Sequence, residues 1–330
     1  MLYKAFVKVH HYLLVQPLQN KSIKSLDSIL ADANRLLSIK GKTFYWASFL
    51  LNKRHAQRAA RLYRFCRYID DLADEANSVS IAKKNLKKLS DDINNGQSED
   101  LIIVDALLLF NECSIEKEIV LELINGVYSD LAKVRMQDLE QLLHYCYQVA
   151  GTVGLMMCRV LDIKDKTAYP FAIDLGIAMQ LTNICRDVRD DAVMGRRYLP
   201  TTLVGNLEPA ELTSPNPSIE PQLSAALASM LSIADSYYKS GNAGLSFISL
   251  RARAGILIAS KLYQAIGIKL QKQSYHYWQK RAMLSTQDKL MLSIKTLAAL
   301  IFTVEFWTAA TCHDKSLHQS ITALPYTHAS

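Results

Sequence analysis

The chain has 330 residues, of which 50% are hydrophobic and 21% charged, an ordinary globular composition. Only 12 glycines and 8 prolines are present, which favours helices over a fold of strands and tight turns. The net charge of +7 fits a solvated basic surface, a polyanionic substrate or an anionic membrane. A nucleic-acid partner is not expected, because the basic residues form no dense run with interleaved aromatic residues.

The cysteines and the apolar segments predict a cytoplasmic protein. The six cysteines form no Cys-x-x-Cys pair and lie mostly in apolar helical contexts, which indicates reduced, buried thiols. The first residues lack the apolar core and cleavage site of a signal peptide. The most apolar stretch, Leu290 to Cys312, is interrupted by Lys295 and Glu305, so we expect a buried core helix rather than a membrane span.

Hydrophobic periodicity predicts a single all-α domain over residues 25–312. A basic arm (1–24) precedes this domain and a loose tail (313–330) follows it. A proline-rich stretch, 204–221, is expected to be a surface loop within the domain. The expected helices span residues 25–38, 52–77, 101–110, 115–130, 139–161, 171–191, 223–239, 250–271 and 288–311, with a further helix opening at 42.

A stripe of oxygen-bearing side chains follows one face of the expected 171–191 helix. At 3.6 residues per turn, Gln180, Asn183, Asp187 and Asp191 fall within an arc of roughly 80°. The preceding segment is apolar, so this helix is expected to be buried. Buried carboxylates are costly unless they are paired or bound to a metal. The face therefore needs a cationic partner.

The expected 52–77 helix carries a second acidic face. Tyr63, Arg67, Asp70 and Asp74 share an arc of about 100°. Two carboxylates four residues apart repel each other, which makes sense if something cationic sits between them. For this stretch alone, a solvated acidic helix end is an equally good interpretation.

Together the two faces indicate a magnesium–diphosphate site. Carboxylate and amide oxygens with no nearby His or Cys suit Mg²⁺ rather than zinc, and Mg²⁺ commonly binds carboxylates together with substrate phosphates. Arg67 and Arg186 accompany the acidic positions and can reach a phosphate. A structural ion-pair network is the less favoured alternative for two such faces. The remaining cavity lining is apolar and aromatic, which suits a prenyl chain: Phe44, Tyr45, Tyr63, Tyr145, Val149 and Val153.

From about Lys40 to Thr296 the chain resembles the squalene/phytoene synthases, which join two prenyl diphosphates head to head, and it is most similar to their bacterial phytoene synthases. The family usually has Ser where this chain has Gly41, which puts a hydroxyl contact to diphosphate at this position in doubt, although a backbone N–H could substitute for it. The motifs that carry the resemblance are Lys42–Phe44, Tyr63–Glu75, Tyr145–Gly154, Gln180–Asp191, Gly195–Pro200, Ala259–Lys269 and Lys280–Ala282.

The resemblance implies an all-α isoprenoid synthase fold around a central cavity. It implies that Mg²⁺, with Mn²⁺ as a substitute, is held by Asp70, Asp74, Asn183, Asp187 and Asp191. The implied diphosphate contacts are Lys42, Arg67, Arg186, Tyr198, Tyr263 and Arg281, with Thr43 in the same substrate-binding element as Lys42. The implied prenyl-site residues are Phe44, Tyr63, Tyr145, Val149, Val153, Gly154 and Gln180.

The implied reaction converts two geranylgeranyl diphosphates to phytoene through a cyclopropylcarbinyl (prephytoene) diphosphate, the first step of carotenoid biosynthesis, without NADPH. The main alternative is a C30 synthase that makes dehydrosqualene or squalene from farnesyl diphosphate, because chain length depends on cavity depth. A head-to-tail prenyltransferase or terpene cyclase fits the arginine-flanked motifs less well. Intact acidic positions disfavour a non-catalytic assembly subunit that has kept the fold.

Peripheral contact with the inner face of a membrane is a further expectation. The basic arm carries Lys4, Lys8, Lys21 and Lys24, and the implied product is insoluble in water. The sequence does not indicate an oligomeric state.

Overall fold

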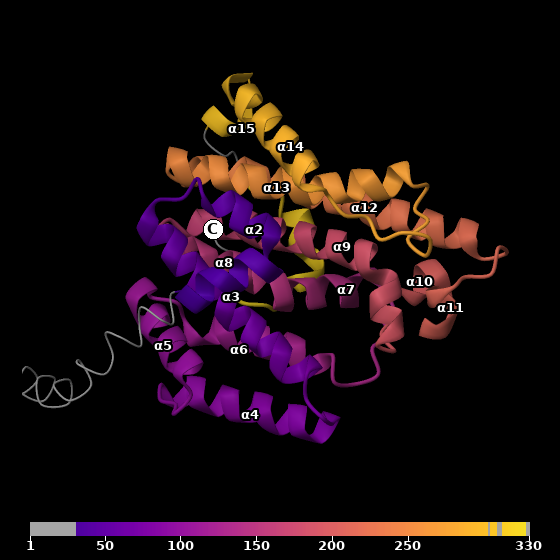
Figure 1. The fold of residues 1–330 in the computed structure, drawn as a ribbon, viewed down its shortest axis with the longest axis horizontal. Coiled ribbons are helices and arrows are strands. Elements are labelled where there is room, and N and C mark those ends of the chain that lie inside the picture. Colours follow the sequence, from indigo (N-terminus) through magenta and orange to yellow (C-terminus); the bar gives the residue numbers. More distant parts are fainter. Residues whose placement is uncertain (1–30, 303, 309–311, 328–330) are drawn as a thin grey trace, which may run out of the picture.

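The computed structural model describes residues 31–302, 304–308 and 312–327, and every regular element in these ranges is a helix. Figure 1 shows α9 running through the middle of the molecule, with α12 and α13 on one side of it and α7 on the other. The α-helices are α2 (Lys42–Ser48), α3 (Lys53–Asp74), α4 (Val79–Asn95), α5 (Leu101–Cys113), α6 (Lys117–Ser129), α7 (Leu139–Cys146), α8 (Thr152–Val160), α9 (Tyr169–Val193), α10 (Thr201–Val204), α11 (Pro209–Thr213), α12 (Glu220–Ala243), α13 (Leu250–Lys272), α14 (Thr286–Ala299) and α15 (Val304–Trp307). The remaining elements are a π-helix, η1 (Tyr147–Gly151), and the 3-10 helices η2 (Lys166–Ala168), η3 (Gly244–Phe247), η4 (Leu300–Phe302) and η5 (Lys315–Ile321).

Local sequence signals set the ends of several helices where periodicity predicts them. The Asn52 side chain accepts a hydrogen bond from the backbone N–H of His55 and caps α3, and Ser78 caps α4 in the same way. Gly96 ends α4 in the left-handed conformation, with φ 68°. The expected loop at 204–221 begins as α10 ends, contains the short helix α11, and ends as α12 begins. The predicted helical order is therefore confirmed along the described chain.

Close backbone packing explains two glycines, Gly154 on α8 and Gly176 on α9. A Cβ on Gly154 would lie 2.2 Å from the carbonyl oxygen of Ala172 on α9, and one on Gly176 would lie 2.3 Å from that of Ala150. The π-turn of η1 interrupts the segment immediately before α8. Glycine is thus required where α8 and η1 lie directly on α9.

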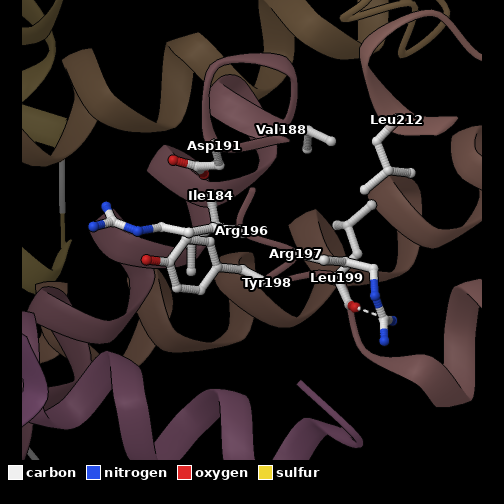
Figure 2. Close-up of a pocket in the computed structure, with 8 residues that line it drawn as sticks. All are labelled: Ile184, Val188, Asp191, Arg196, Arg197, Tyr198, Leu199 and Leu212. Atoms are coloured by element: carbon white, nitrogen blue, oxygen red, sulfur yellow. Dashed lines mark hydrogen bonds between the residues drawn. The ribbon is translucent and has the colours of Figure 1, made fainter. Parts of the chain in front are cut away.

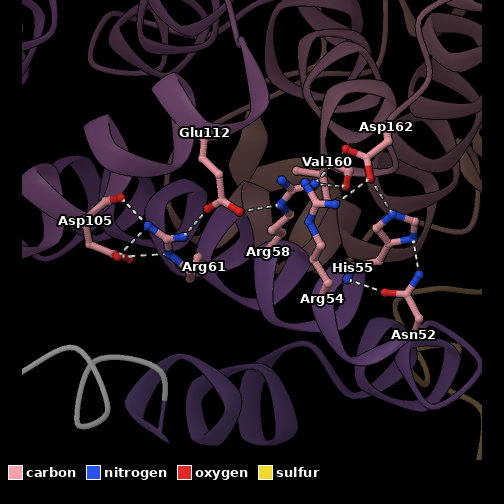
Figure 3. A network of polar contacts seen from close by, with 9 residues as sticks. All are labelled: Asn52, Arg54, His55, Arg58, Arg61, Asp105, Glu112, Val160 and Asp162. Atoms are coloured by element: carbon pink, nitrogen blue, oxygen red, sulfur yellow. Dashed lines mark hydrogen bonds and ion pairs between the residues drawn. The ribbon is translucent and has the colours of Figure 1, made fainter. Parts of the chain in front are cut away.

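A network of ion pairs anchors the first half of α3 (Figure 3). The Arg58 guanidinium is buried and donates to Glu112 on α5 at 2.9 Å and to Asp162, after α8, at 2.8 Å. Arg61 donates to Asp105 at 2.9 Å and to Glu112 at 3.0 Å. These contacts hold α3 against α5 and the α8–α9 connection, and so orient the second half of α3, which carries Asp70 and Asp74.

The C-terminal segment differs from the expected loose tail. Residues 312–327 dock on the helices, and η5 packs against α7. The hydroxyl of Tyr237 donates to the carbonyl of Leu317 and that of Tyr147 to the carbonyl of Pro325, both at 2.6 Å. Buried phenols need acceptors, and this polar segment supplies them from its backbone. The loose-tail prediction is wrong for these residues, whereas the basic arm lies outside the described residues.

The stretch expected as a buried core helix over 288–311 is also different. The helix α14 ends at Ala299, and its buried side chains are Ser293 and Thr296. Its large apolar side chains instead face outward, with Leu290 48%, Met291 55% and Ile294 58% exposed. The opposite side of α14 contacts the domain, and there Trp46 Nε1 donates to Ser293 Oγ at 2.9 Å. Within the described ranges, no helix combines the length and apolarity that crossing a membrane requires.

Candidate active site

The two acidic faces converge between α3 and α9. Arg196, just after α9, forms a 2.8 Å ion pair with Asp74 on α3. Burial raises the pKa of Asp191 on α9, and the same guanidinium opposes that rise, so it acts on both faces. Burial also raises the pKa of Asp70, and the carboxylate of Asp130, at the end of α6, adds to the rise in both groups. One compact cluster thus unites acidic groups from α3, α6 and α9.

The carboxylates of this cluster lack enough positive charge. Burial, with smaller contributions from Asp74 and Asp130, raises the pKa of Asp70 to about 7 despite the opposing Arg67. Burial and the neighbouring Asp187 raise the pKa of Asp191 to about 8 against the effect of Arg196. A cation placed between the helices would relieve this repulsion.

The residues of α9 also fit a hard metal ion. Asn183, Asp187 and Asp191 follow each other at four-residue intervals, so they lie on one helix face. Asn183 donates through Nδ2 to Gln180 at 3.3 Å, while its Oδ1 is buried and has no hydrogen-bond partner in the described chain. An unpaired buried amide oxygen is costly unless something absent from the structure binds it. With the carboxylates beside it, this oxygen suits Mg²⁺.

Arginines occupy the flanks of the acidic cluster. Asp187 accepts from Arg186 Nε and from Arg281 Nε, both at 2.8 Å. Arg67, expected beside Asp70, instead forms a 2.6 Å ion pair with Asp71. Exchange of a carboxylate for a phosphate oxygen would leave each guanidinium in a contact of the same kind.

Asp130 is a site residue that the sequence analysis missed. Its carboxylate accepts from the hydroxyl of Tyr145 at 2.8 Å and from that of Tyr198 at 2.7 Å, and the two rings stack with centroids 5.0 Å apart. In Figure 2 the Tyr198 hydroxyl, the Asp191 carboxylate and the Arg196 guanidinium point to the same side. Asp130 has no acidic partner at helical spacing, so only its burial beside the cluster reveals it.

Aromatic rings from three helices cover the other end of the site. Phe44 on α2 lies 5.2 Å from Tyr263 on α13 and 6.4 Å from Tyr63 on α3, between ring centroids. Against the effect of burial, Asp187 raises the pKa of Arg186, and Tyr263 adds a smaller contribution, which connects the rings to the acidic cluster. A Cβ on Gly41 would lie 2.8 Å from the Tyr63 ring, so this ring packing explains glycine there.

The remaining predicted residues lie less close to the acidic cluster or have a packing role. Lys42 is exposed and Thr43 half-buried on α2. Val149 and Val153 are half-buried and pack against the main hydrophobic core. Gly154 makes the backbone contact with α9 described above, which is a packing role whether or not a substrate also reaches it.

Comparison with known proteins identifies the fold and the family. A family model described as squalene/phytoene synthase matches residues 38–288. The chain belongs to the squalene/phytoene synthase family. A squalene/phytoene synthase relative from Pseudescherichia vulneris, named phytoene synthase, is 33% identical over 281 residues, covering 80% of this chain and 89% of that protein. A 15-cis-phytoene synthase from Pantoea ananas is 30% identical over 280 residues, covering 80% and 90%.

Solved structures of the squalene/phytoene synthase family share the architecture. A dehydrosqualene synthase in complex with a ligand superposes with a TM-score of 0.72 at 26% identity and covers 84% of this chain and 99% of that one. A squalene synthase from Alicyclobacillus acidocaldarius superposes with a TM-score of 0.66 at 20% identity, covering 76% and 96%. The predicted all-α isoprenoid synthase fold and the predicted family are therefore confirmed.

Proposed function

We propose that the chain is a phytoene synthase that condenses two geranylgeranyl diphosphates head to head. The observation that carries the proposal is the acidic cluster between α3 and α9, with its unpaired Asn183 Oδ1 and its raised carboxyl pKa values. Relatives named phytoene synthase, 30% and 33% identical over most of their length, support this substrate class.

In the proposed site, Asp70, Asp74, Asn183, Asp187 and Asp191 hold Mg²⁺, or Mn²⁺ in its place. When bound, the metal supplies positive charge to the departing diphosphate. Departure of the first diphosphate gives an allylic cation, which the C2–C3 double bond of the second chain attacks. Proton loss then gives the cyclopropylcarbinyl diphosphate, which ionises, rearranges and loses a second proton to form a conjugated triene.

The chain's own side chains have separate tasks in this reaction. Arg186 and Arg281 are proposed to pass from Asp187 to the diphosphate oxygens and to orient them. The rings of Phe44 and Tyr263 present π-faces that stabilise a passing cation. The hydrogen bonds from Tyr145 and Tyr198 keep the Asp130 carboxylate fixed at the metal side of the cavity.

Incubation with geranylgeranyl diphosphate and Mg²⁺ tests the proposal. Phytoene is expected without any reductant, because no NADPH is required for a final proton loss. Farnesyl diphosphate, each substrate with EDTA, and each substrate with NADPH form the parallel reactions, with products separated by chromatography and identified by mass. The alternative is a C30 synthase, which the structural likeness to a dehydrosqualene synthase favours. Turnover of farnesyl diphosphate alone would establish it, and a product that forms only with NADPH would indicate squalene synthesis.

We further propose that α14 brings the enzyme to a membrane surface, where its apolar substrates and product reside. Leu290, Met291 and Ile294 project from one side of α14 and are about half exposed. Lys295 on the same helix is exposed too, and a basic residue at this place favours anionic lipid. Partial insertion of three such side chains is worth about 1 kcal/mol each.

Sedimentation with vesicles of anionic phospholipid checks this proposal. The Ile294→Glu variant is expected to bind at least about tenfold more weakly than the wild type, because a carboxylate replaces an inserted side chain. Leu108→Glu is the matched control, since Leu108 is 51% exposed but lies on α5. Equal losses in both variants, or no binding of the wild type at low salt, would refute the role of α14.

A further inference from the structure

A second cluster of metal-binding groups lies on α9, away from the acidic cluster. The carboxylate of Asp174 is fully buried, and its two oxygens face different histidines of the C-terminal segment. Oδ1 is 2.7 Å from His318 Nε2, and Oδ2 is 2.7 Å from His313 Nε2. Ser240 on α12 also donates to Oδ2 at 2.5 Å. The ligand atoms of Asp174, His313 and His318 all lie within 4.8 Å of one another.

The hydrogen bonds of His318 leave its second nitrogen without a compatible partner in the neutral state. His318 Nδ1 lies 3.0 Å from the backbone carbonyl of Thr327, which only accepts, so Nδ1 carries a proton. A neutral imidazole then directs the lone pair of Nε2 at a carboxylate oxygen. Two acceptor atoms, Nε2 and the carboxylate oxygen, would then face each other. This contact is favourable only if a second proton or a cation lies between them. A backbone carbonyl that fixes the far nitrogen is also the usual support of a metal-bound histidine.

We propose that Asp174, His313 and His318 form a structural Zn²⁺ site that joins the C-terminal segment to α9. Two imidazole nitrogens and one carboxylate oxygen suit zinc, with an open fourth position, and the hydrogen bond from Ser240 Oγ orients the carboxylate. Mg²⁺ is disfavoured here because it prefers oxygen ligands. The same helix would thus hold two metals of different chemistry, zinc at Asp174 and magnesium from Asn183 onward.

Zinc binding would change the spacing of the ligand atoms. Two ligand atoms bound tetrahedrally to one zinc ion lie about 3.3 Å apart, so the 2.7 Å distances from the histidine nitrogens to the carboxylate oxygens would lengthen on binding. His313 lies before η5 and is the more exposed of the two histidines, which allows this movement. Asp174 lies nine residues before Asn183, which is roughly 14 Å along the helix axis, so the two sites are separate.

His313 and His318 lie beyond residue 288, where the family match ends. Two of the three proposed ligands therefore lie outside the family match, whereas Asp174 lies within it. The site would fasten the C-terminal segment beside the tyrosine contacts already described, Tyr237 to Leu317 and Tyr147 to Pro325. Loss of the metal is expected to loosen residues 312–327 first and to leave the acidic cluster intact.

Metal analysis of the full-length, tag-free protein tests the site. After saturation with Zn²⁺ and dialysis, the wild type is expected to retain one zinc per chain by mass spectrometry, and added zinc is expected to raise its melting temperature even when magnesium is present in excess. The variants His313→Ala and His318→Ala are expected to retain less than a tenth of that zinc. His144→Ala, which removes an exposed histidine on α7, and Cys312→Ser, which removes the neighbouring exposed thiol, are expected to retain all of it.

A spectroscopic measurement on the unaltered protein keeps the test decisive if a variant fails to fold. Co²⁺ in place of zinc is expected to show the intense visible bands of tetrahedral coordination, which Zn²⁺ removes. The proposal is overturned if the wild type retains no stoichiometric zinc, or if cobalt shows only the weak bands of the hydrated ion. It is overturned equally if zinc is lost on Asp187→Asn but kept in His313→Ala, since the metal would then lie in the acidic cluster.

Discussion

The Asp187→Asn variant is expected to lower kcat/KM for prenyl coupling by at least about 10³-fold, which corresponds to about 4 kcal/mol of transition-state stabilisation. Asp187 lies four residues from both Asn183 and Asp191, at the centre of the proposed metal face of α9. It also accepts from Arg186 and Arg281, so it holds both proposed diphosphate ligands. Asparagine keeps the size of the side chain but removes the charge that both roles require.

Initial rates over a range of Mg²⁺ concentrations measure this effect. The apparent affinity for Mg²⁺ is expected to fall together with the rate, and excess metal restores only part of the activity. Asp235→Asn serves as the control, because Asp235 is an exposed carboxylate on α12 that only accepts from Gln264. The melting temperature of the variant is measured as well, because the substitution relieves repulsion with Asp191 but weakens the ion pairs with Arg186 and Arg281. Activity within tenfold of the wild type would remove Asp187 from the proposed metal site.

The Arg58→Ala variant is expected to lower the free energy of unfolding by about 2–4 kcal/mol. The guanidinium of Arg58 is only 2% exposed and bridges Glu112 and Asp162 across three segments of the chain. Its removal leaves a cavity and two carboxylates without their main partner. Those carboxylates are 43% and 44% exposed, so water compensates part of the loss and the effect stays below that of a fully buried pair.

Urea denaturation of the wild type and two variants measures this prediction. Arg54→Ala is the matched control, because Arg54 is 64% exposed and contacts the same Asp162 at 3.6 Å. Exposed pairs of this kind contribute about 0.5 kcal/mol or less. If Arg58→Ala and Arg54→Ala shift the midpoint equally, the network in Figure 3 does not anchor α3 in the way described.

The sequence alone predicted the helical order and both halves of the candidate site. Helix periodicity is a local property, so the spacing of Asp70 and Asp74, and of Asn183, Asp187 and Asp191, is enough to place each set on one face. The resemblance carried by the motifs around these residues predicted the family, which the comparisons confirm. The role of each residue in metal and substrate binding stays a prediction until the variants above are measured.

The exposure of the apolar side chains of α14 could not be predicted from composition. Leu290, Met291 and Ile294 make the stretch as apolar as a core helix, yet burial depends on which neighbours are present to cover it. The side of α14 that faces the domain buries only small side chains, Ser293 at Trp46 and Thr296. Composition also fails to predict the position of the C-terminal segment. Its polar residues predict a solvated tail, but the structure shows that buried tyrosine hydroxyls and Asp174 are their partners.

The sequence by itself therefore determined the features that depend on spacing along one helix, including the acidic faces of α3 and α9. What only the tertiary structure decided is which distant groups meet those faces. The hydroxyls of Tyr145 and Tyr198 hold Asp130 in the cluster by hydrogen bonds. Arg196 links the two faces through its ion pair with Asp74. The physical reason is that burial and charge pairing depend on distances in the folded protein and not on spacing along the chain. A single acidic residue such as Asp130 therefore forms no recognisable sequence pattern, and only its burial in the folded protein reveals it.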